Sequence, residues 1–148
     1  MKTVPNEIKG FFGQYRFLSN FYPSKVTFEG VEYPTVEHAY QAAKTNDWVI
    51  RGHISRMDTP AQAKRAGRTL NQIDWHERSL KTMEDLVLLK FISDTDLRRL
   101  LLITGDAYLE ETNKWHDTFW GVCEGVGENH LGKILMRVRE KIRNEKGI

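Results

Sequence analysis

Glu37 is the residue whose position most directly suggests chemistry. It follows Thr35, a residue type that caps helices, and a helix is predicted from Val36 to about Thr45. This places Glu37 in the first helical turn, where unpaired backbone N–H groups and the helix dipole favour a negative charge. An ionised carboxylate suits a base, a nucleophile or a stabiliser of positive charge. Helix initiation alone is the alternative interpretation, because acids are common in first turns.

The tryptophans form a second candidate group. Trp75, Trp115 and Trp120 lie close to polar or charged residues such as Asp117, and Trp48 is expected in a polar loop. An indole at a helix start or in a loop can stack on a flat ring, as nucleobase sites require. Core packing is the ordinary alternative for any one tryptophan, and capping a turn is the ordinary role of Asp117.

Several familiar catalytic patterns are absent from the sequence. The histidines show no His-x3-His spacing and there is no Cys-x2-Cys pair, so we expect no zinc site. Neither a phosphate-binding Gly-x4-Gly-Lys-Ser/Thr loop nor a Gly-x-Ser-x-Gly elbow occurs. The glycines of Gly121–Gly127 do not fit the dinucleotide fingerprint. We therefore expect an activity that uses no metal and no cofactor.

Capping residues, turn residues and the spacing of apolar residues predict the helices and strands that position these side chains. A hairpin is predicted over Lys25–Tyr33, turning at Glu29-Gly30. Further predicted helices run from Pro60 to Gly67, Trp75 to about Ile92, Leu97 to Ile103 and from about Asn129 onward. Short strands are expected in Ala107–Thr112 and Thr118–Cys123, and loops in Asn46–Asp58 and Gly121–Glu128. The expected fold is α+β, a helix-rich domain with a small sheet.

Composition sets the class of protein. The 148 residues are 40% hydrophobic and 28% charged, with a net charge of +2, which predicts one globular domain over residues 1–148. This charge balance does not by itself favour nucleic-acid or membrane binding. A single cysteine forms no internal disulfide, and no secretory signal or apolar run of about 20 residues is present. We therefore expect a cytoplasmic protein without a membrane segment.

Blocks along nearly the whole chain resemble one family. Phe17-Leu-Ser-Asn-Phe21 and Tyr33-Pro-Thr-Val-Glu-His-Ala-Tyr-Gln-Ala-Ala-Lys44 resemble the opening of the NADAR superfamily, the YbiA-like N-glycosidases. The resemblance continues through residues 63–68, Trp75, Lys90-Phe91, Asp117-Thr-Phe-Trp-Gly121 and residues 129–136, in the family's order. Glu124 and Glu128 depart from the glycine- and lysine-rich character that relatives show in the loop they occupy.

The resemblance implies a hydrolase of the N-glycosidic bond between a ribose and a nitrogenous ring. The implied substrates are phosphoribosylamino-pyrimidine intermediates of riboflavin synthesis, or ADP-ribose attached to guanine in nucleic acid. By motif, Glu37 and Asp117 are the expected catalytic residues, and the expected substrate-binding residues are Asn20, Trp75, Trp120 and Asn129.

Three cations are the best candidates to bind a 5′-phosphate or pyrophosphate: Lys44, Arg68 and Lys90. Lys44 follows Glu37 by seven residues, about two helical turns, so both are expected on one helix face. A non-catalytic ADP-ribose or nucleotide reader remains the alternative function. Glu37 distinguishes the two, because a pure binder of a phosphorylated ligand gains nothing from an anion beside the ribose carbon.

Overall fold

The computed structural model describes residues 4–70, 72 and 74–145. Their contacts group into two compact units, a middle unit (Asn20–Ser93) and a terminal unit (Met1–Ser19 with Asp94–Ile148). The single domain expected over residues 1–148 stays a prediction. Positions 1–3, 71, 73 and 146–148 of that range lie outside the described residues.

The middle unit begins with the predicted hairpin. Strand β2 (Val26–Phe28) pairs antiparallel with β3 (Val31–Tyr33). Glu29 and Gly30 turn the chain with φ angles of 48° and 84°. Two-residue hairpin turns require this left-handed backbone, which glycine adopts without strain. The hairpin prediction is therefore confirmed.

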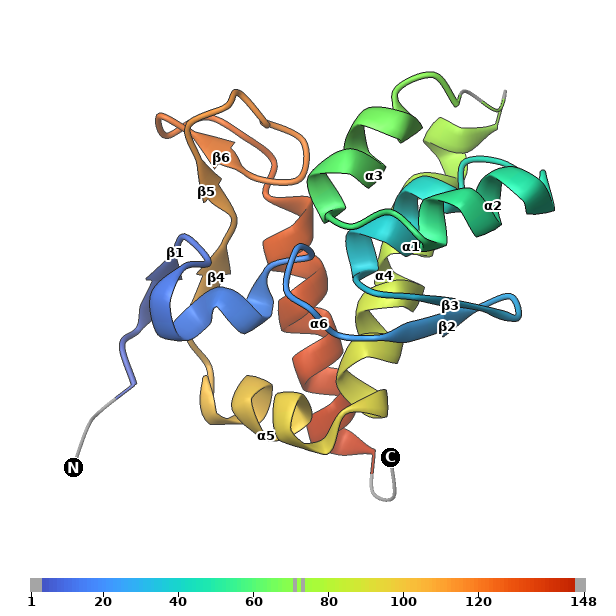
Figure 1. Cartoon of the computed structure of the whole chain (residues 1–148). Helices are drawn as coiled ribbons and strands as arrows, with labels where there is room; N and C mark the ends of the chain where they lie inside the picture. The colour runs from blue at the N-terminus through green and yellow to red at the C-terminus, as the bar shows by residue number, and fades with distance from the viewer. Residues whose placement is uncertain (1–3, 71, 73, 146–148) are drawn as a thin grey trace. The chain divides into compact units, whose positions relative to one another are not determined.

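Helices make up the rest of the middle unit. They are α1 (Val36–Ala42), α2 (Trp48–Ser55), α3 (Pro60–Gly67) and α4 (Trp75–Ser93). Every residue of α1 is buried, and this helix packs against the other three (Figure 1). Helix α1 is therefore the centre of the unit.

Capping side chains set the helix starts as the sequence predicts. The Thr35 hydroxyl accepts a hydrogen bond from the His38 N–H and begins α1. Thr59 and Gln62 form a reciprocal capping box at the start of α3, with Pro60 as its first residue. Both helix starts are confirmed.

Two predictions about the chain after α1 are wrong. Helix α1 ends at Ala42 instead of Thr45, because the Lys44 and Thr45 N–H groups bond to carbonyls three residues back, in a tighter turn. The segment Asn46–Asp58 is not a loop, and Trp48 is the first residue of α2. The Asp47 carboxylate begins that helix by accepting hydrogen bonds from the second and third N–H groups after it.

The terminal unit combines short parallel strand pairs with two helices. Strand β1 (Glu7–Lys9) pairs with β4 (Tyr108–Glu110), and β5 (Thr112–Asn113) pairs with β6 (Val122–Cys123). The second predicted strand is shorter than expected, because residue 118 is irregular and the backbone bends at residues 119–121. A 3-10 helix (Gly13–Leu18) follows β1.

Helices α5 (Thr95–Ile103) and α6 (His130–Asn144) complete this unit. The Asp94 carboxylate accepts a hydrogen bond from the Leu97 N–H, and α5 begins at Thr95, two residues before the predicted start. The predicted apolar face of α6 is buried, and it consists of Leu131, Ile134, Leu135, Val138 and Ile142. Its opposite face carries the exposed cations Lys133, Arg137, Lys141 and Arg143.

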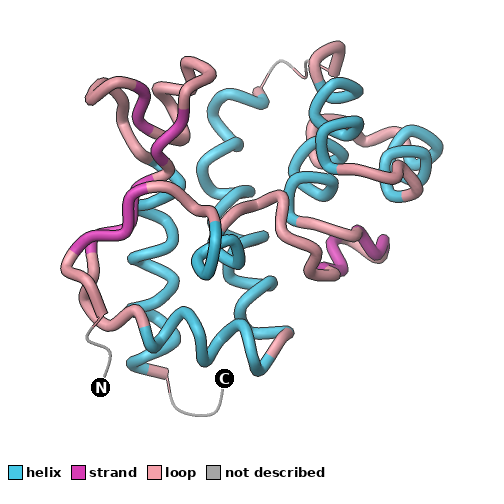
Figure 2. The backbone as a smooth tube through the Cα atoms, turned by 60° about the vertical axis from the view of Figure 1, so that its left-hand side comes forward, coloured by secondary structure: helices cyan, strands magenta, loops and turns pink. Residues whose placement is uncertain are grey.

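The α+β class is confirmed. Figure 2 shows that helices dominate both units while the strands are short. Within the described residues the strands form separate two-stranded pairs. The site residues are therefore positioned by helix packing and not by a large sheet.

Candidate functional site

Glu37 lies in the first turn of α1, as the sequence predicts. Its side chain is 8% exposed, and one carboxylate oxygen, Oε2, accepts a hydrogen bond of 2.8 Å from the Gln41 amide, one turn later. Its backbone N–H donates to the Asn20 carbonyl at 3.1 Å. A carboxylate that only assists helix initiation would be exposed to water. Glu37 is instead a buried acid with a dedicated donor.

Asn20 ties the start of α1 to α4. Besides accepting from Glu37, it is 9% exposed and its amide nitrogen lies 3.3 Å from the Met83 sulfur. Met83 belongs to α4, the helix that Trp75 begins. Asn20 therefore holds the first turn of α1 against the middle of a second helix.

Lys44 interacts with Glu37 across the end of α1. Burial lowers the pKa of the Lys44 amine, the charge of Glu37 partly offsets this, and the charge of Lys64 lowers the pKa further. The Lys44 Nζ atom also lies 5.5 Å from the centre of the Tyr40 ring. The two charges therefore lie close enough to interact. The expectation that both residues lie on one helix face is wrong, because α1 ends before Lys44.

Trp75 joins this group through an aromatic contact between helices. Its ring centre lies 5.1 Å from that of Tyr40, at an interplanar angle of 57°, and the Arg78 guanidinium lies 5.2 Å from the indole. Trp75 is half-buried, so part of the indole remains open to solvent. We call the linked set the Glu37 cluster; its members are Asn20, Glu37, Tyr40, Gln41, Lys44 and Trp75.

The other two predicted cations lie at the end of α3 and on α4. Arg68 caps the C-terminal end of α3 and is exposed. Lys90 lies on α4, fifteen residues after Trp75, which corresponds to roughly 22 Å of helix. Lys90 is 1% exposed, its Nζ lies 5.0 Å from the Phe91 ring and 5.7 Å from the Tyr22 ring, and burial lowers its pKa to about 7. Phosphate binding by either residue stays a prediction.

Asp117 and Trp120 lie in the terminal unit, in a turn that Asp117 itself organises. Its Oδ1 atom accepts hydrogen bonds from the Phe119 and Trp120 N–H groups at 3.2 and 2.9 Å. The Trp120 ring is half-buried and meets the Phe119 ring edge-on at 4.9 Å. Asp117 therefore has a structural role, and its catalytic role and the substrate contact of Trp120 stay predictions.

Asn129 is also bound to its own unit. Its amide oxygen accepts from the Glu111 N–H, and its amide nitrogen donates to the Leu109 carbonyl and the Tyr108 hydroxyl. The residue is 3% exposed and has a left-handed backbone, with φ of 53°. It joins β4 to the start of α6, and substrate binding by Asn129 stays a prediction.

The glycine-rich segment after Trp120 is shaped by close backbone contacts. A Cβ at Gly121 would collide with the Glu111 carbonyl, and one at Gly127 would collide with the Gly121 carbonyl. Gly127 also has a φ of 153°. Packing therefore explains these glycines without a bound phosphate.

Tyr40 and Gln41 are the site residues that the sequence reasoning missed. Gln41 stands four residues after Glu37, the spacing at which helix side chains meet. That spacing is the signal that identifies it. The contact of Tyr40 with Trp75 depends on how α1 and α4 pack, which no local spacing reveals.

The chemistry available to the Glu37 cluster is electrostatic. A buried carboxylate, a partly buried amine and two aromatic rings lie together on α1 and at the start of α4. Fixed charges in a site shielded from water stabilise charge that develops in a transition state. The cluster therefore suits a reaction in which positive charge grows beside a flat ring.

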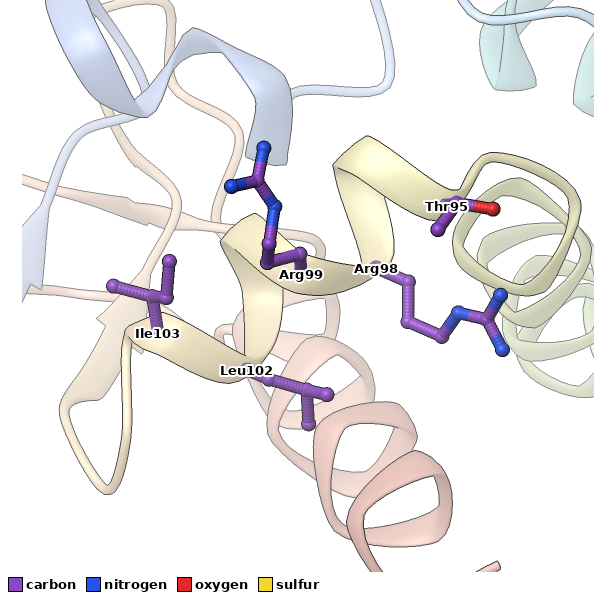
Figure 3. Close-up of a pocket in the computed structure, with 5 residues that line it drawn as sticks. All are labelled: Thr95, Arg98, Arg99, Leu102 and Ile103. Carbon is purple, nitrogen blue, oxygen red and sulfur yellow. The ribbon is translucent and has the colours of Figure 1, made fainter. Parts of the chain in front are cut away.

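Three other kinds of feature bear on function: metal sites, membrane-spanning helices and pockets. Among residues 4–70, 72 and 74–145, no group of three or more His, Cys, Asp or Glu side chains is arranged to hold a metal ion. No described helix is long and apolar enough to cross a membrane. A surface pocket on α5 is lined by side chains of that helix alone (Figure 3): Thr95, Arg98, Arg99, Leu102 and Ile103.

Two known proteins similar to this chain carry the name N-glycosidase. The chain is 42% identical over 137 residues to an N-glycosidase of Nostoc punctiforme, covering 88% of this chain and 87% of that protein. It is 35% identical over 136 residues to the N-glycosidase YbiA of Escherichia coli K12, covering 89% and 84%. The NMR structure of E. coli YbiA matches with a TM-score of 0.85 at 33% identity, covering 97% of this chain and 89% of that one.

A third relative is longer. The chain is 40% identical over 131 residues to a riboflavin biosynthesis protein of Vibrio vulnificus, a match covering 86% of this chain and 35% of that protein. This chain therefore spans about a third of that relative's length. The family model of the NADAR domain matches residues 9–143. With relatives at this level of identity over most of its length, the chain belongs to the NADAR family.

Proposed function

We propose that this chain is an N-glycosidase that hydrolyses the bond between a ribose and a nitrogenous heterocycle. The observation that carries the proposal is the buried Glu37 carboxylate, which Gln41 holds at 2.8 Å in the first turn of α1. The curated relatives of similar length carry the name N-glycosidase. An N-glycosidase needs such a carboxylate, whereas a protein that only binds a phosphorylated ligand does not.

Cleavage of an N-glycosidic bond passes through an oxocarbenium-like transition state, with positive charge on the ribose ring. The oxygen of a water molecule forms the new bond to the anomeric carbon. The C–N bond breaks, its electron pair leaves with the nitrogen, and that nitrogen takes up a proton. Glu37 stabilises the positive charge and orients the water, because it is fixed in place before the charge develops.

Aromatic rings and a cation of the cluster complete the arrangement. Trp75 stacks on the departing heterocycle, with Tyr40 supporting the indole from α1. Lys44 contributes the cation for a phosphate on the ribose, since its amine lies near both Glu37 and Tyr40. The roles predicted for the other site residues remain part of the proposal. They are catalysis by Asp117, substrate binding by Trp120 and Asn129, and phosphate binding by Arg68 and Lys90.

The substrate we favour is a phosphoribosylamino-pyrimidine of riboflavin synthesis. The names of the Vibrio vulnificus relative and of a Zea mays relative, 35% identical over 146 residues, support it, because both are riboflavin biosynthesis proteins. ADP-ribose on guanine in nucleic acid is the second substrate, because stacking on an aromatic ring does not distinguish a purine from a pyrimidine. A cytoplasmic setting is part of the proposal, since one buried cysteine gives no internal disulfide.

Mass spectrometry of reaction products tests the proposal. The protein is incubated with the phosphoribosylamino-pyrimidine, and separately with a DNA oligonucleotide carrying ADP-ribosyl-guanine, with Glu37→Gln as the blank. Release of ribose 5-phosphate is the expected result, and Glu37→Gln should lower turnover at least 100-fold, as charged groups at such centres do. Turnover within about tenfold of the unchanged protein contradicts the role of Glu37.

Two other outcomes are informative. Release of ADP-ribose with restored DNA makes the chain a hydrolase of modified nucleic acid. Binding of ADP-ribose with no product above the blank from either substrate makes it a nucleotide reader.

A further inference from the structure

Gln41 is the group that determines how the Glu37 carboxylate is presented. It lies one turn after Glu37 on α1, its side-chain amide is buried, and its Nε2 atom donates to Glu37 Oε2 at 2.8 Å. A carboxylate that accepts such a bond is favoured in its ionised form and restricted to one orientation.

The other end of the Gln41 amide is unusual. Its Oε1 atom is buried and has no hydrogen-bond partner among the residues that the structure describes. A buried acceptor without a partner is costly. The amide keeps this arrangement because the reverse orientation would place Oε1 against the negative carboxylate. The orientation of Gln41 is therefore set by the charge of Glu37.

Gly67 makes this arrangement possible. A Cβ at Gly67 would lie 2.6 Å from Gln41 Cδ and closer still to Oε1, in an overlap that no real structure tolerates. Gly67 is the last residue of α3 and its φ is not positive, so no backbone requirement explains a glycine there. Alanine is the better helix former. The space taken by the Gln41 amide is the reason for the glycine.

We infer that Gln41 is a positioning residue that holds Glu37 ionised and in one orientation, and that Gly67 of α3 leaves the space that the Gln41 amide needs for this. The inference deepens the proposed function, on which its catalytic consequence rests. Helix α3 contributes no side chain to the reaction itself. Under this inference it nevertheless influences the orientation and ionisation of the Glu37 carboxylate on α1.

The first test observes Glu37 without measuring activity. Carboxyl ¹³C NMR follows the titration of Glu37, whose signal is assigned by its loss in Glu37→Gln. Gln41→Met keeps an unbranched side chain of similar length and removes the donor. We expect the titration midpoint to rise by about one pH unit, because a hydrogen bond to a charged group is lost. An unchanged midpoint overturns the inference.

Nearby charges do not confound this comparison. Lys44 interacts with Glu37, and Lys64 of α3 interacts with Lys44. Every variant here keeps both lysines, so their effects cancel between variants.

The second test uses the two helical glycines of the middle unit as a matched pair. Gly67→Ala should move the acid limb of kcat/KM to higher pH, in the same direction as Gln41→Met, and lower kcat/KM by up to about tenfold at pH values below that limb. Gly52→Ala is the control, because a Cβ there meets only the flexible end of Arg56, at 3.3 Å. Equal effects of the two alanine substitutions overturn the role of Gly67.

A double-mutant comparison tests whether Gly67 acts through Gln41. In a Gln41→Ala background the colliding Cδ and Oε1 atoms are gone, so adding Gly67→Ala should change kcat/KM less than it does in the unchanged protein. If Gly67→Ala lowers kcat/KM as much in the Gln41→Ala background as in the unchanged protein, the inference is contradicted. If Gln41→Met does not fold, the Glu37 titration is measured in Gly67→Ala instead, which keeps Gln41. An unchanged midpoint there also overturns the inference.

The inference and the proposed function can fail separately. If Glu37→Gln keeps full turnover while Gln41→Met still moves the Glu37 titration, the proposed function is wrong and the positioning of Glu37 by Gln41 is right. If Glu37→Gln is inactive and neither Gln41→Met nor Gly67→Ala moves the titration, the positioning is wrong and the proposed function stands.

Discussion

The rings of Tyr40 and Trp75 lie 5.1 Å apart at 57°, one near the end of α1 and the other at the start of α4. This contact links the helix that carries Glu37 to the indole proposed to hold the departing heterocycle. Trp75 is half-buried while Tyr40 is only 7% exposed, so the indole is the more accessible of the two rings.

Trp75→Leu should weaken substrate binding more than it slows the chemical step. Stacking on an aromatic side chain contributes about 1–3 kcal/mol per base, so KM should rise roughly 5- to 150-fold while kcat changes little. Steady-state kinetics measure the two constants separately. The control is Trp115→Leu, in the terminal unit, where the indole is 61% exposed. A fall in kcat alone would contradict the stacking role.

Lys44 should respond to its two charged neighbours with opposite signs. Glu37 raises the pKa of the Lys44 amine and Lys64 lowers it. Glu37→Gln should therefore lower this pKa, and Lys64→Met should raise it. NMR titration of the Lys44 Cε resonance, in protein with ¹³C-labelled lysine, measures both shifts. Movement in the same direction in both variants would show that Lys44 does not lie between these charges.

Lys90 should destabilise the fold at neutral pH. Burial lowers its pKa from 10.5 to about 7, so between these values the unfolded chain binds a proton that the folded chain does not. Stability should therefore rise with pH across that window, by at most about 1.4 kcal/mol per pH unit. Lys90→Met should be more stable than the unchanged protein at pH 7, and this advantage should shrink toward pH 10.

Urea unfolding at pH 7, 8.5 and 10 measures this difference. The control is Lys81→Met, on the same helix, where the side chain is 82% exposed and pairs with Asp85. A Lys90→Met protein that is less stable at pH 7 would show that the folded state compensates the buried amine.

His38 should make the fold sensitive to acid. Its ring is fully buried, with Nε2 bonded to the Met57 carbonyl at 3.0 Å and Nδ1 to the Thr35 hydroxyl at 2.8 Å. Burial lowers the pKa of this imidazole below its usual 6.5. Stability should therefore be fully present above about pH 6.5 and fall as the pH drops toward the folded-state pKa, because the unfolded chain protonates first.

Imidazole proton NMR provides the measurement, with urea unfolding between pH 5 and 7.5 alongside. A His38 titration midpoint at or above the usual 6.5 would contradict the prediction.

Much of the fold was predictable because its signals are local. The turn at Glu29-Gly30 and the caps at Thr35, Thr59 and Asp94 each depend on a few neighbouring residues. Helix α2 was missed because its apolar signal is weak. Trp48 and Val49 are 59% and 80% exposed, and the helix depends on its Asp47 cap and on the packing of a few buried side chains.

The sequence by itself determined the family blocks, the first-turn position of Glu37 and the four-residue spacing that brings Gln41 to it, because a helix converts spacing directly into proximity. Tertiary structure decided that Glu37 is buried, that Tyr40 meets Trp75, that Gly67 leaves room for the Gln41 amide and that Lys90 is buried. These depend on contacts between segments far apart in the chain. Burial and hydrogen-bond partners are properties of packed helices, which no local stretch of sequence contains.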